Sequence, residues 1–347
     1  MGRQTNFVLN TTQEDIDNIL PDNKELMEDF INYLESTDHA KTSLKVYRNN
    51  MEIFFVYLLK HAKNKDFVNI KKRDILNFQN YMIKNGLSSS RIKNIKSTIS
   101  SLSNFIESIL DEEEKWEDFR NIVNKIPAPN PNTVREKTVL ADEDCQRLLD
   151  YLVENKQYQK ACAFALAWAS GRRKSELLRI KRSYIDEKNL QYGALYKTPE
   201  KIKTKGAGQG KFLNVYILKS KFKPYFDLWM EERKRLGVPE EIDEIFVIKR
   251  KGEWKVASVS TLNSWAEKFS EFLNTNFYWH SLRHQFCTGL LKAKIPSAVV
   301  QKIIGWSSSD MVNLYNDRDV DDELGEYFDE NGVKENIKSS SLADLSS

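Results

Sequence analysis

Three prolines crowd into residues 126–133 (IPAPNPNT), about a third of the way along the 347-residue chain. Proline fixes its own φ angle and lacks the amide hydrogen that helices and central strands need. No regular element can run through this stretch, so we expect an extended linker over residues 126–137. The residues before it and after it therefore have to fold as separate domains.

The part before the linker repeats apolar residues at the three- and four-residue steps of amphipathic helices. We expect four helices, over residues 24–34, 42–58, 72–85 and 88–110. Thr42 is the expected N-cap of the second helix, and Asn85 with Gly86 ends the third. The pattern predicts a helical domain over residues 24–125, preceded by a short extension over residues 1–23.

Each of these helices has one apolar and one polar face. The inward stripes include Ile83 in the third helix and Ile109 in the fourth. The polar face of the fourth helix carries three basic residues that could meet the phosphates or a groove of DNA: Arg91, Lys93 and Lys96.

The part after the linker mixes helices with short strands. We expect helices over residues 142–152, 157–170, 261–273, 280–291 and 297–304, with a short one near residues 321–328. Expected strands cover residues 195–196, 212–218 and 245–248, with glycines 206, 208 and 210 marking the turn between the first two. The fold class is therefore mainly α with a small β-sheet (α+β). The second domain covers residues 138–318, and an acidic tail covers residues 319–347.

Charge is unevenly distributed along the chain. Residues 1–39 and residues 316–347 each carry a net charge of −7, which leaves +17 on residues 40–315 within a total of +3. A strongly basic body favours a polyanion partner, most often nucleic acid, over the alternative of a solvated basic surface.

Composition narrows the class of protein further. With 40% hydrophobic and 30% charged residues, the chain is neither disordered nor collagen-like. It has no apolar run long enough to span a membrane, and its N-terminus resembles no signal or transit peptide. Three scattered cysteines, Cys145, Cys162 and Cys287, favour reduced thiols over disulfides or a structural zinc site. We therefore expect a cytoplasmic protein with no membrane partner.

Three polar clusters in the second domain are candidates for chemistry. They read SGRRKSEL at residues 170–177, HSLR at residues 280–283, and GWSSS at residues 305–309 followed by Leu314 and Tyr315. Arginine offers a planar fork of donors to a phosphate, and a histidine three residues away on a helix shares its face. Taken alone, each cluster also fits a structural interpretation: a solvated helix end, a chance pairing, or a packed tryptophan.

Taken in order, the clusters resemble the active-site signature of the tyrosine recombinase (phage integrase) family. The residues that match are Arg173, Lys205, His280, Arg283, Trp306 and Tyr315. Trp306 follows Arg283 by 23 residues and Tyr315 follows Trp306 by nine, both typical of that family. The sequence segments around these residues resemble three conserved motifs of the family, T-G-x-R-x-S-E-L, H-x-L-R-H-x-F and I-x-x-x-L-G-H-x-S-x-x-x-T-x-x-Y. The resemblance covers about residues 24–328.

The resemblance implies a SAM-like core-binding domain of four helices followed by a tyrosine-recombinase catalytic domain. It further implies that Tyr315 attacks DNA to form a 3′-phosphotyrosyl link, while Arg173 and Arg283 clamp the phosphate. Lys205 would protonate the departing 5′ oxygen, His280 would handle a proton or bind the phosphate, and Trp306 would buttress it. Glu176 would orient the basic groups. No cofactor is implied.

Two positions depart from the family pattern or leave a choice. Trp306 stands where most members have His, and its indole N–H can donate in that place. The lysine has three candidates, because Lys203 and Lys211 flank Lys205, which precedes a turn glycine as the family's catalytic lysine does.

The resemblance predicts a site-specific DNA recombinase, and we favour the integrase or excision enzyme of a phage or other mobile element. The alternatives are a chromosome-dimer-resolving recombinase, a type IB topoisomerase-like enzyme and a catalytically silent DNA-binding protein. Expected partners are double-stranded DNA and three further copies in a tetramer on paired sites, with accessory DNA-bending or directionality proteins as candidates. Leu324, Tyr327 and Phe328 in the acidic tail predict a helix that docks on a neighbouring protomer.

Overall fold

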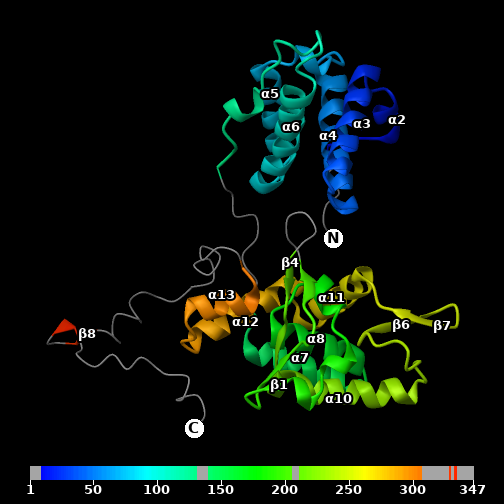
Figure 1. The fold of residues 1–347 in the computed structure, drawn as a ribbon, viewed down its shortest axis with the longest axis vertical. Coiled ribbons are helices and arrows are strands. Elements are labelled where there is room, and N and C mark those ends of the chain that lie inside the picture. The colour runs from blue at the N-terminus through cyan, green and yellow to red at the C-terminus, as the bar shows by residue number, and fades with distance from the viewer. Residues whose placement is uncertain (1–8, 131–139, 205–210, 307–327, 330–331, 334–347) are drawn as a thin grey trace. The chain divides into compact units, whose positions relative to one another are not determined.

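The computed structural model describes residues 9–130, 140–204, 211–306, 328–329 and 332–333. The chain divides into two compact units, each with its own core (Figure 1). We call residues 9–130 the helical unit and the described residues of 140–306 the mixed unit.

The helical unit has five α-helices and two 3₁₀ turns among its described residues. The helices are α2 (Gln13–Asp17), α3 (Pro21–Ser36), α4 (Lys41–His61), α5 (Lys72–Lys84) and α6 (Ser89–Ile109), and the turns are Phe67–Asn69 and Val123–Lys125. Helix α4 contributes most to the core, where Phe54 is fully buried and lies edge-on to Phe55, Phe67 and Phe78. Edge-to-face packing of this kind favours a fixed arrangement of the rings.

The four expected helices of this unit are confirmed, with some corrections in detail. Helix α4 begins before Thr42, and Ala40 is its N-cap, so the Thr42 cap is wrong. Ile83 and Ile109 are 46% and 51% exposed, because each lies in the last turn of its helix, beyond the packed stripe. Leu9 and Ile19 are buried in the helical core, so the expected short extension belongs to the folded unit from residue 9 onward.

The mixed unit is built around a buried helix. Its helices are α7 (Asp142–Glu154), α8 (Tyr158–Ser170), α9 (Lys174–Leu177), α10 (Lys219–Arg235), α11 (Val259–Leu273), α12 (Trp279–Lys292) and α13 (Ser297–Ile304). Every residue of α8 from Ala161 to Ser170 is buried, and α7, α10 and α12 pack against it. A helix that is apolar all round can lie only inside a core. The alanine-rich sequence lets its neighbours approach closely.

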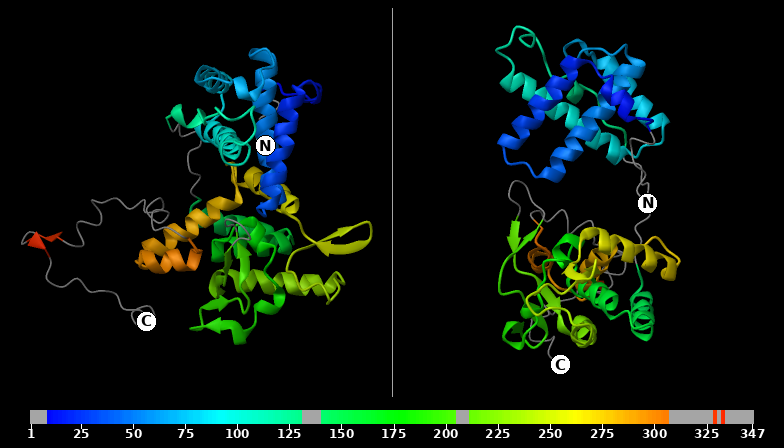
Figure 2. Two further views of the ribbon diagram at one scale, coloured as in Figure 1. Left: turned by 45° about the horizontal axis from the view of Figure 1, so that its top comes forward. Right: turned by 90° about the vertical axis from the view of Figure 1, so that its right-hand side faces the viewer.

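The strands form separate small sheets rather than the one sheet expected. Strands β1 (Leu190–Gln191), β2 (Leu195–Lys197) and β5 (Tyr216–Leu218) make an antiparallel sheet in the order β1-β2-β5. The other strands pair as hairpins: β3 (Ile202–Thr204) with β4 (Lys211–Leu213), β6 (Val247–Arg250) with β7 (Glu253–Val256), and β8 (Phe328–Asp329) with β9 (Gly332–Val333). The β6–β7 hairpin extends away from the body of its unit (Figure 2).

The single strand expected over residues 212–218 is wrong, because the chain changes sheets within it. The Asn214 side chain donates to the Thr198 carbonyl at 2.7 Å, and the Val215 amide donates to the Thr198 hydroxyl at 3.0 Å. These bonds divide the segment into β4 and β5. The glycines expected to mark the turn lie outside the described residues.

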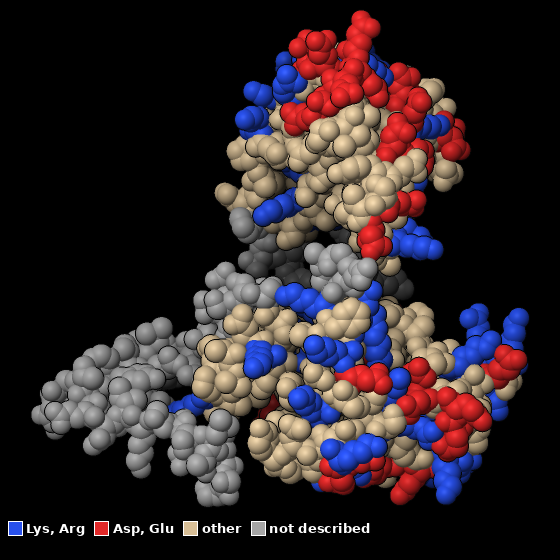
Figure 3. All heavy atoms as spheres, in the orientation of Figure 1, with Lys and Arg blue, Asp and Glu red and all other residues tan. Residues whose placement is uncertain are grey.

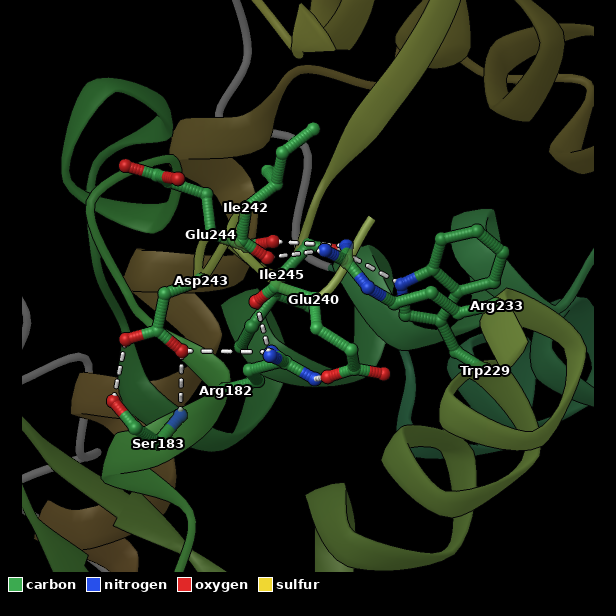
Figure 4. Close-up of polar contacts among 9 residues, drawn as sticks. All are labelled: Arg182, Ser183, Trp229, Arg233, Glu240, Ile242, Asp243, Glu244 and Ile245. Carbon is green, nitrogen blue, oxygen red and sulfur yellow. Dashed lines mark hydrogen bonds and ion pairs between the residues drawn. The ribbon is translucent and has the colours of Figure 1, made fainter. Parts of the chain in front are cut away.

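Helix α10 was missing from the helices expected from the sequence. It contains Pro224, although proline disfavours helix interiors. Burial explains why it forms: Phe222, Phe226 and Trp229 face the core. Near its end Arg233 is 3% exposed and donates to the carbonyls of Ile242, Glu244 and Ile245 (Figure 4). The Trp229 indole also donates to the Ile245 carbonyl, at 2.8 Å. This network fixes the chain between α10 and β6.

The expected tail helix lies mostly outside the described residues, as do Leu324 and Tyr327. Its last residue, Phe328, is in strand β8 and pairs with Val333, so a helix does not reach it. Among the described helices, none combines the length and the apolar run needed to cross a lipid bilayer. Cys145, Cys162 and Cys287 are buried as free thiols.

Candidate functional site

A left-handed glycine brings the first polar cluster against the second and third. Gly171 ends α8 with a φ of +59°, a conformation that side chains disfavour. A Cβ atom here would lie 2.6 Å from the Phe286 ring of α12 and 3.2 Å from the Ile304 side chain of α13. Only glycine permits this approach, so the three segments meet at one corner.

Arg173 lies at the start of α9, immediately after that corner. Its Nη1 donates to Glu176 Oε1 at 3.0 Å, while the Glu176 carboxylate also accepts from the Arg173 amide. The Glu176 side chain is fully buried, whereas that of Arg173 is 32% exposed. The buried Glu176 carboxylate therefore fixes the Arg173 guanidinium, and the exposed part of this guanidinium is open to a ligand.

Arg283 enters the same corner from α12 and is only 1% exposed. Its Nη1 donates to the Gly171 carbonyl at 3.1 Å, and its Nη2 donates to the Ile304 carbonyl at 3.3 Å. One side chain thus connects the end of α8 to the end of α13. The carbonyl groups have no net charge, so they orient the guanidinium without neutralising it.

His280 is the second residue of α12, one turn before Arg283, and is exposed. Removal of water by neighbouring groups lowers the pKa of its imidazole from the ordinary 6.5, and the positive charges of Arg283 and Arg173 lower it further against the attraction of Glu176. The ring is therefore neutral at neutral pH and can accept a proton.

Trp306 follows Gly305, the second left-handed glycine of the site. Gly305 ends α13 at a φ of +79°, and a Cβ there would lie 2.1 Å from the Leu213 side chain of β4. The Trp306 ring is 9% exposed and packs with α12 and α13, with the Arg283 guanidinium 5.6 Å from its centroid. It supports Arg283 from the side through a cation–π contact.

The cluster has an excess of positive charge. Arg172, next to Arg173, is 1% exposed, so three guanidinium groups lie close together. Glu176 is the one buried carboxylate among the described residues. Two positive charges are left over, and an anion such as a phosphodiester would balance them. The described residues hold no group of three or more His, Cys, Asp or Glu side chains placed for a metal ion.

A hollow of about 420 Å³ opens beside this cluster. Arg173 and His280 line it together with Lys174, Tyr278 and Asn263, which accepts a 2.8 Å hydrogen bond from Lys174. Ala266, Phe277 and Trp279 also line the hollow, so a ligand bound at Arg173 would meet apolar as well as polar side chains there.

Two expected site residues, Lys205 and Tyr315, lie outside the described residues. Of the two other lysines considered, Lys203 lies in β3 and Lys211 in β4, and both are exposed. The Lys203 carbonyl accepts a hydrogen bond from Arg179. The structure thus brings together Arg173, Glu176, His280, Arg283 and Trp306.

The expected DNA-facing residues of α6 divide into two kinds. Lys93 is exposed, and Arg91 is half-buried, donating to Asn94 at 2.7 Å and to Asn49 at 3.4 Å. Lys96 is only 7% exposed, so its placement on the polar face is wrong. Its ammonium donates to Gln79 at 2.6 Å and to the carbonyls of Ile126 and Pro127 at 2.8 and 3.3 Å.

Acidic side chains crowd one end of the helical unit (Figure 3), and residues 111–118 alone carry six. Carboxylates and phosphates are both negative and repel each other, so this end is unsuited to binding a nucleic acid. The face of α6 around Arg91 and Lys93 is the better candidate.

Sequence comparison decides the family. Residues 138–321, more than half of the chain, match the phage integrase family. The chain belongs to the phage integrase family. Residues 26–116 match the N-terminal SAM-like domain of phage integrases. The protein is thus a tyrosine-type site-specific DNA recombinase, with the two-domain architecture expected for the family.

Relatives of this integrase-family chain include proteins from bacteria and their prophages. The SPbeta prophage-derived recombinase-like protein YomM of Bacillus subtilis is 28% identical over 85% of this chain and 88% of its own. Tyrosine recombinase XerS of Streptococcus uberis is 25% identical over 74% of this chain and 76% of its own. The Tn1549 transposon integrase, solved with transposon right-end DNA, shares the fold with a TM-score of 0.63 at 18% identity over 86% and 97% of the chains.

Proposed function

We propose that this recombinase integrates or excises a phage or other mobile element. The observation that carries the proposal is the corner at Gly171, where residues from three separate sequence boxes form one cationic cluster. The resemblance to a prophage-derived protein and to a transposon integrase supports a mobile element. The Trp306 position, where most family members have His, supports it as well.

In the proposed reaction the Tyr315 hydroxyl oxygen attacks the scissile phosphorus, and the bond from phosphorus to the 5′ oxygen breaks. His280, neutral before DNA binds, accepts the tyrosine proton, and Lys205 gives a proton to the departing 5′ oxygen. Arg173 and Arg283 stabilise the charge that develops on the non-bridging oxygens. The phosphotyrosyl bond conserves the energy of the broken one, so a 5′ hydroxyl of another duplex reseals it without a nucleotide cofactor.

DNA engagement draws on both units. Arg91 and Lys93 of the helical unit contact the duplex, with Asn49 and Asn94 holding the Arg91 guanidinium in place. Four copies assemble on two paired sites in the cytoplasm, and accessory DNA-bending or directionality proteins select integration or excision.

The experiment offers the purified protein two kinds of duplex. One carries the sequences that flank its own gene, and the other carries the chromosomal dimer-resolution sites of its host. Recombinant products from the gene flanks alone support the mobile-element function. Products from the chromosomal sites alone would contradict it and favour chromosome-dimer resolution, the alternative recombinase function that the sequence leaves open.

A further inference from the structure

Arg172 and Arg173 are neighbours in the sequence but lie in opposite environments. Arg173 is partly exposed and paired with Glu176, whereas Arg172 is 1% exposed and points into the unit. Burying a guanidinium is costly unless every part of it is well solvated by the protein. A buried arginine beside a catalytic one therefore requires an explanation.

The contacts of Arg172 are to the end of α13. Its Nη1 donates to the Ile304 carbonyl at 3.4 Å, and its Nη2 donates to the Ile303 carbonyl. The last carbonyls of a helix lack partners within the helix and carry its negative partial charge, so a cation binds well there. Burial is the main cause that lowers the pKa of Arg172 to about 10, so the side chain stays charged at neutral pH.

Arg283 donates to the Ile304 carbonyl as well, at 3.3 Å. Two guanidinium groups therefore hold the helix end from which Gly305 and Trp306 continue, and Tyr315 follows Trp306 by nine residues. Arg172, which carries one of these groups, directly precedes Arg173 in the chain. The end of α13 is in this way fixed relative to the phosphate clamp.

We propose that Arg172 is a positioning residue that sets the start of the Tyr315-bearing segment relative to Arg173 and Arg283. The inference rests on the proposed function of those residues. Arg172 does not contact the DNA; it acts through the α13 carbonyls. A misplacement of about 1 Å at a reacting group can slow a reaction by about 100-fold, so a tether at this point has a large effect on rate.

The first test compares Arg172→Met with Arg147→Met, a control at an exposed arginine of the same unit. Methionine keeps the length of the buried stem and removes the donors. We expect Arg172→Met to bind DNA normally and to cleave it roughly 10- to 100-fold more slowly in a single turnover. Arg172→Lys, which restores one cation, recovers part of the rate. Cleavage by Arg172→Met at the wild-type rate would overturn the proposal.

A neutral substrate separates positioning from phosphate binding. A methylphosphonate at the scissile position lacks the negative charge that an arginine clamp neutralises. It rescues Arg173→Ala, since that variant lacks one of the two clamp arginines, but leaves Arg172→Met slow. Equal rescue of both variants would overturn the positioning role and place Arg172 in the clamp.

A readout independent of activity completes the test. The chain has seven tryptophans, and fluorotryptophan labelling gives each a ¹⁹F NMR resonance. Trp306→Phe identifies the Trp306 signal. We expect Arg172→Met to shift or broaden that signal and to leave unchanged the signal of Trp116, the one tryptophan of the helical unit. An unmoved Trp306 signal in a folded Arg172→Met protein contradicts the proposal. If the wild-type protein cleaves no DNA, the proposed function fails, while this measurement still decides the role of Arg172.

Discussion

A buried cation fixes a chain segment in each unit, but only in the mixed unit do several cations gather at one site. In the helical unit Lys96 binds the carbonyls of Ile126 and Pro127, where the linker begins. In the mixed unit Arg172 and Arg283 bind the last carbonyls of α13. Lys96 stands alone, whereas the two arginines share their site with Arg173. In the helical unit the buried cation therefore only holds the chain. In the mixed unit the buried cations hold the chain and also help to form an anion site.

Net charge follows the same division. Residues 9–130 carry a net charge of −2, and surface cations such as Arg48 and Lys60 pair with carboxylates. Residues 140–306 carry +11. The mixed unit therefore attracts DNA as a whole, while the helical unit depends on a few selected residues.

The largest expected effect is on the clamp of the mixed unit. Arg173→Ala and Arg283→Ala should each slow DNA cleavage by about 10²–10³-fold, because each removes a charge that stabilises the transition state. Single-turnover cleavage at saturating protein measures this directly. Lys302→Ala, which removes an exposed cation of the same unit, is the control. Near-normal cleavage by either arginine variant would place the clamp elsewhere.

The choice of catalytic lysine concerns an effect of comparable size. General acid catalysis contributes about 10²–10⁴-fold, so Lys205→Ala should be slow on ordinary DNA. A 5′-phosphorothiolate leaves as a thiolate that needs little protonation and should restore the rate of Lys205→Ala. If the phosphorothiolate restores the cleavage rate of Lys203→Ala instead, Lys203 is the general acid.

Lys96 and Lys93 give a matched pair in the helical unit. Lys96→Met should lower the free energy of unfolding by about 1–3 kcal/mol, because it leaves buried acceptors without a donor. Lys93→Met should leave stability unchanged, weaken DNA binding and reduce the salt-dependence slope by about one. Urea unfolding and binding at several salt concentrations measure the two effects. A destabilised Lys93→Met, or a Lys96→Met defect confined to DNA binding, would reverse this assignment.

The smallest effect is a shift in the titration of His280. Its pKa in the free protein should lie below 6.5, and a bound phosphate should raise it, since an anion offsets the charges of Arg173 and Arg283. Because the folded-state pKa is lowered, protonation of His280 favours unfolding, and its effect on stability grows as the pH falls below 6.5. NMR titration with and without inorganic phosphate tests this. A pKa above 6.5 without phosphate would contradict the electrostatics of the corner.

How much of this was predictable from the sequence depends on the type of signal. Periodicity located the helices around Phe54 and Phe78, since apolar spacing reports directly on burial. It missed α10, a helix that contains Pro224 and buries Phe222, Phe226 and Trp229. The spacing of the boxes predicted the candidate site, because its residues follow a fixed order in the chain.

The direction in which individual side chains point could not be predicted from the sequence. Nothing in the pair Arg172-Arg173 tells which one is buried, because that depends on the left-handed turn at Gly171 and on carbonyls more than 130 residues away. Lys96 was misplaced for a related reason, since its partners Ile126 and Pro127 belong to the linker rather than to its own helix.

The most direct test of the account is to find the atom that becomes joined to DNA. A duplex nicked near the cleavage position traps the covalent complex, which denaturing electrophoresis detects and peptide mass spectrometry maps. We predict an adduct on Tyr315, absent from Tyr315→Phe although that variant binds DNA nearly as well as the wild type. An adduct that persists in Tyr315→Phe, or that maps to another residue, would contradict the account.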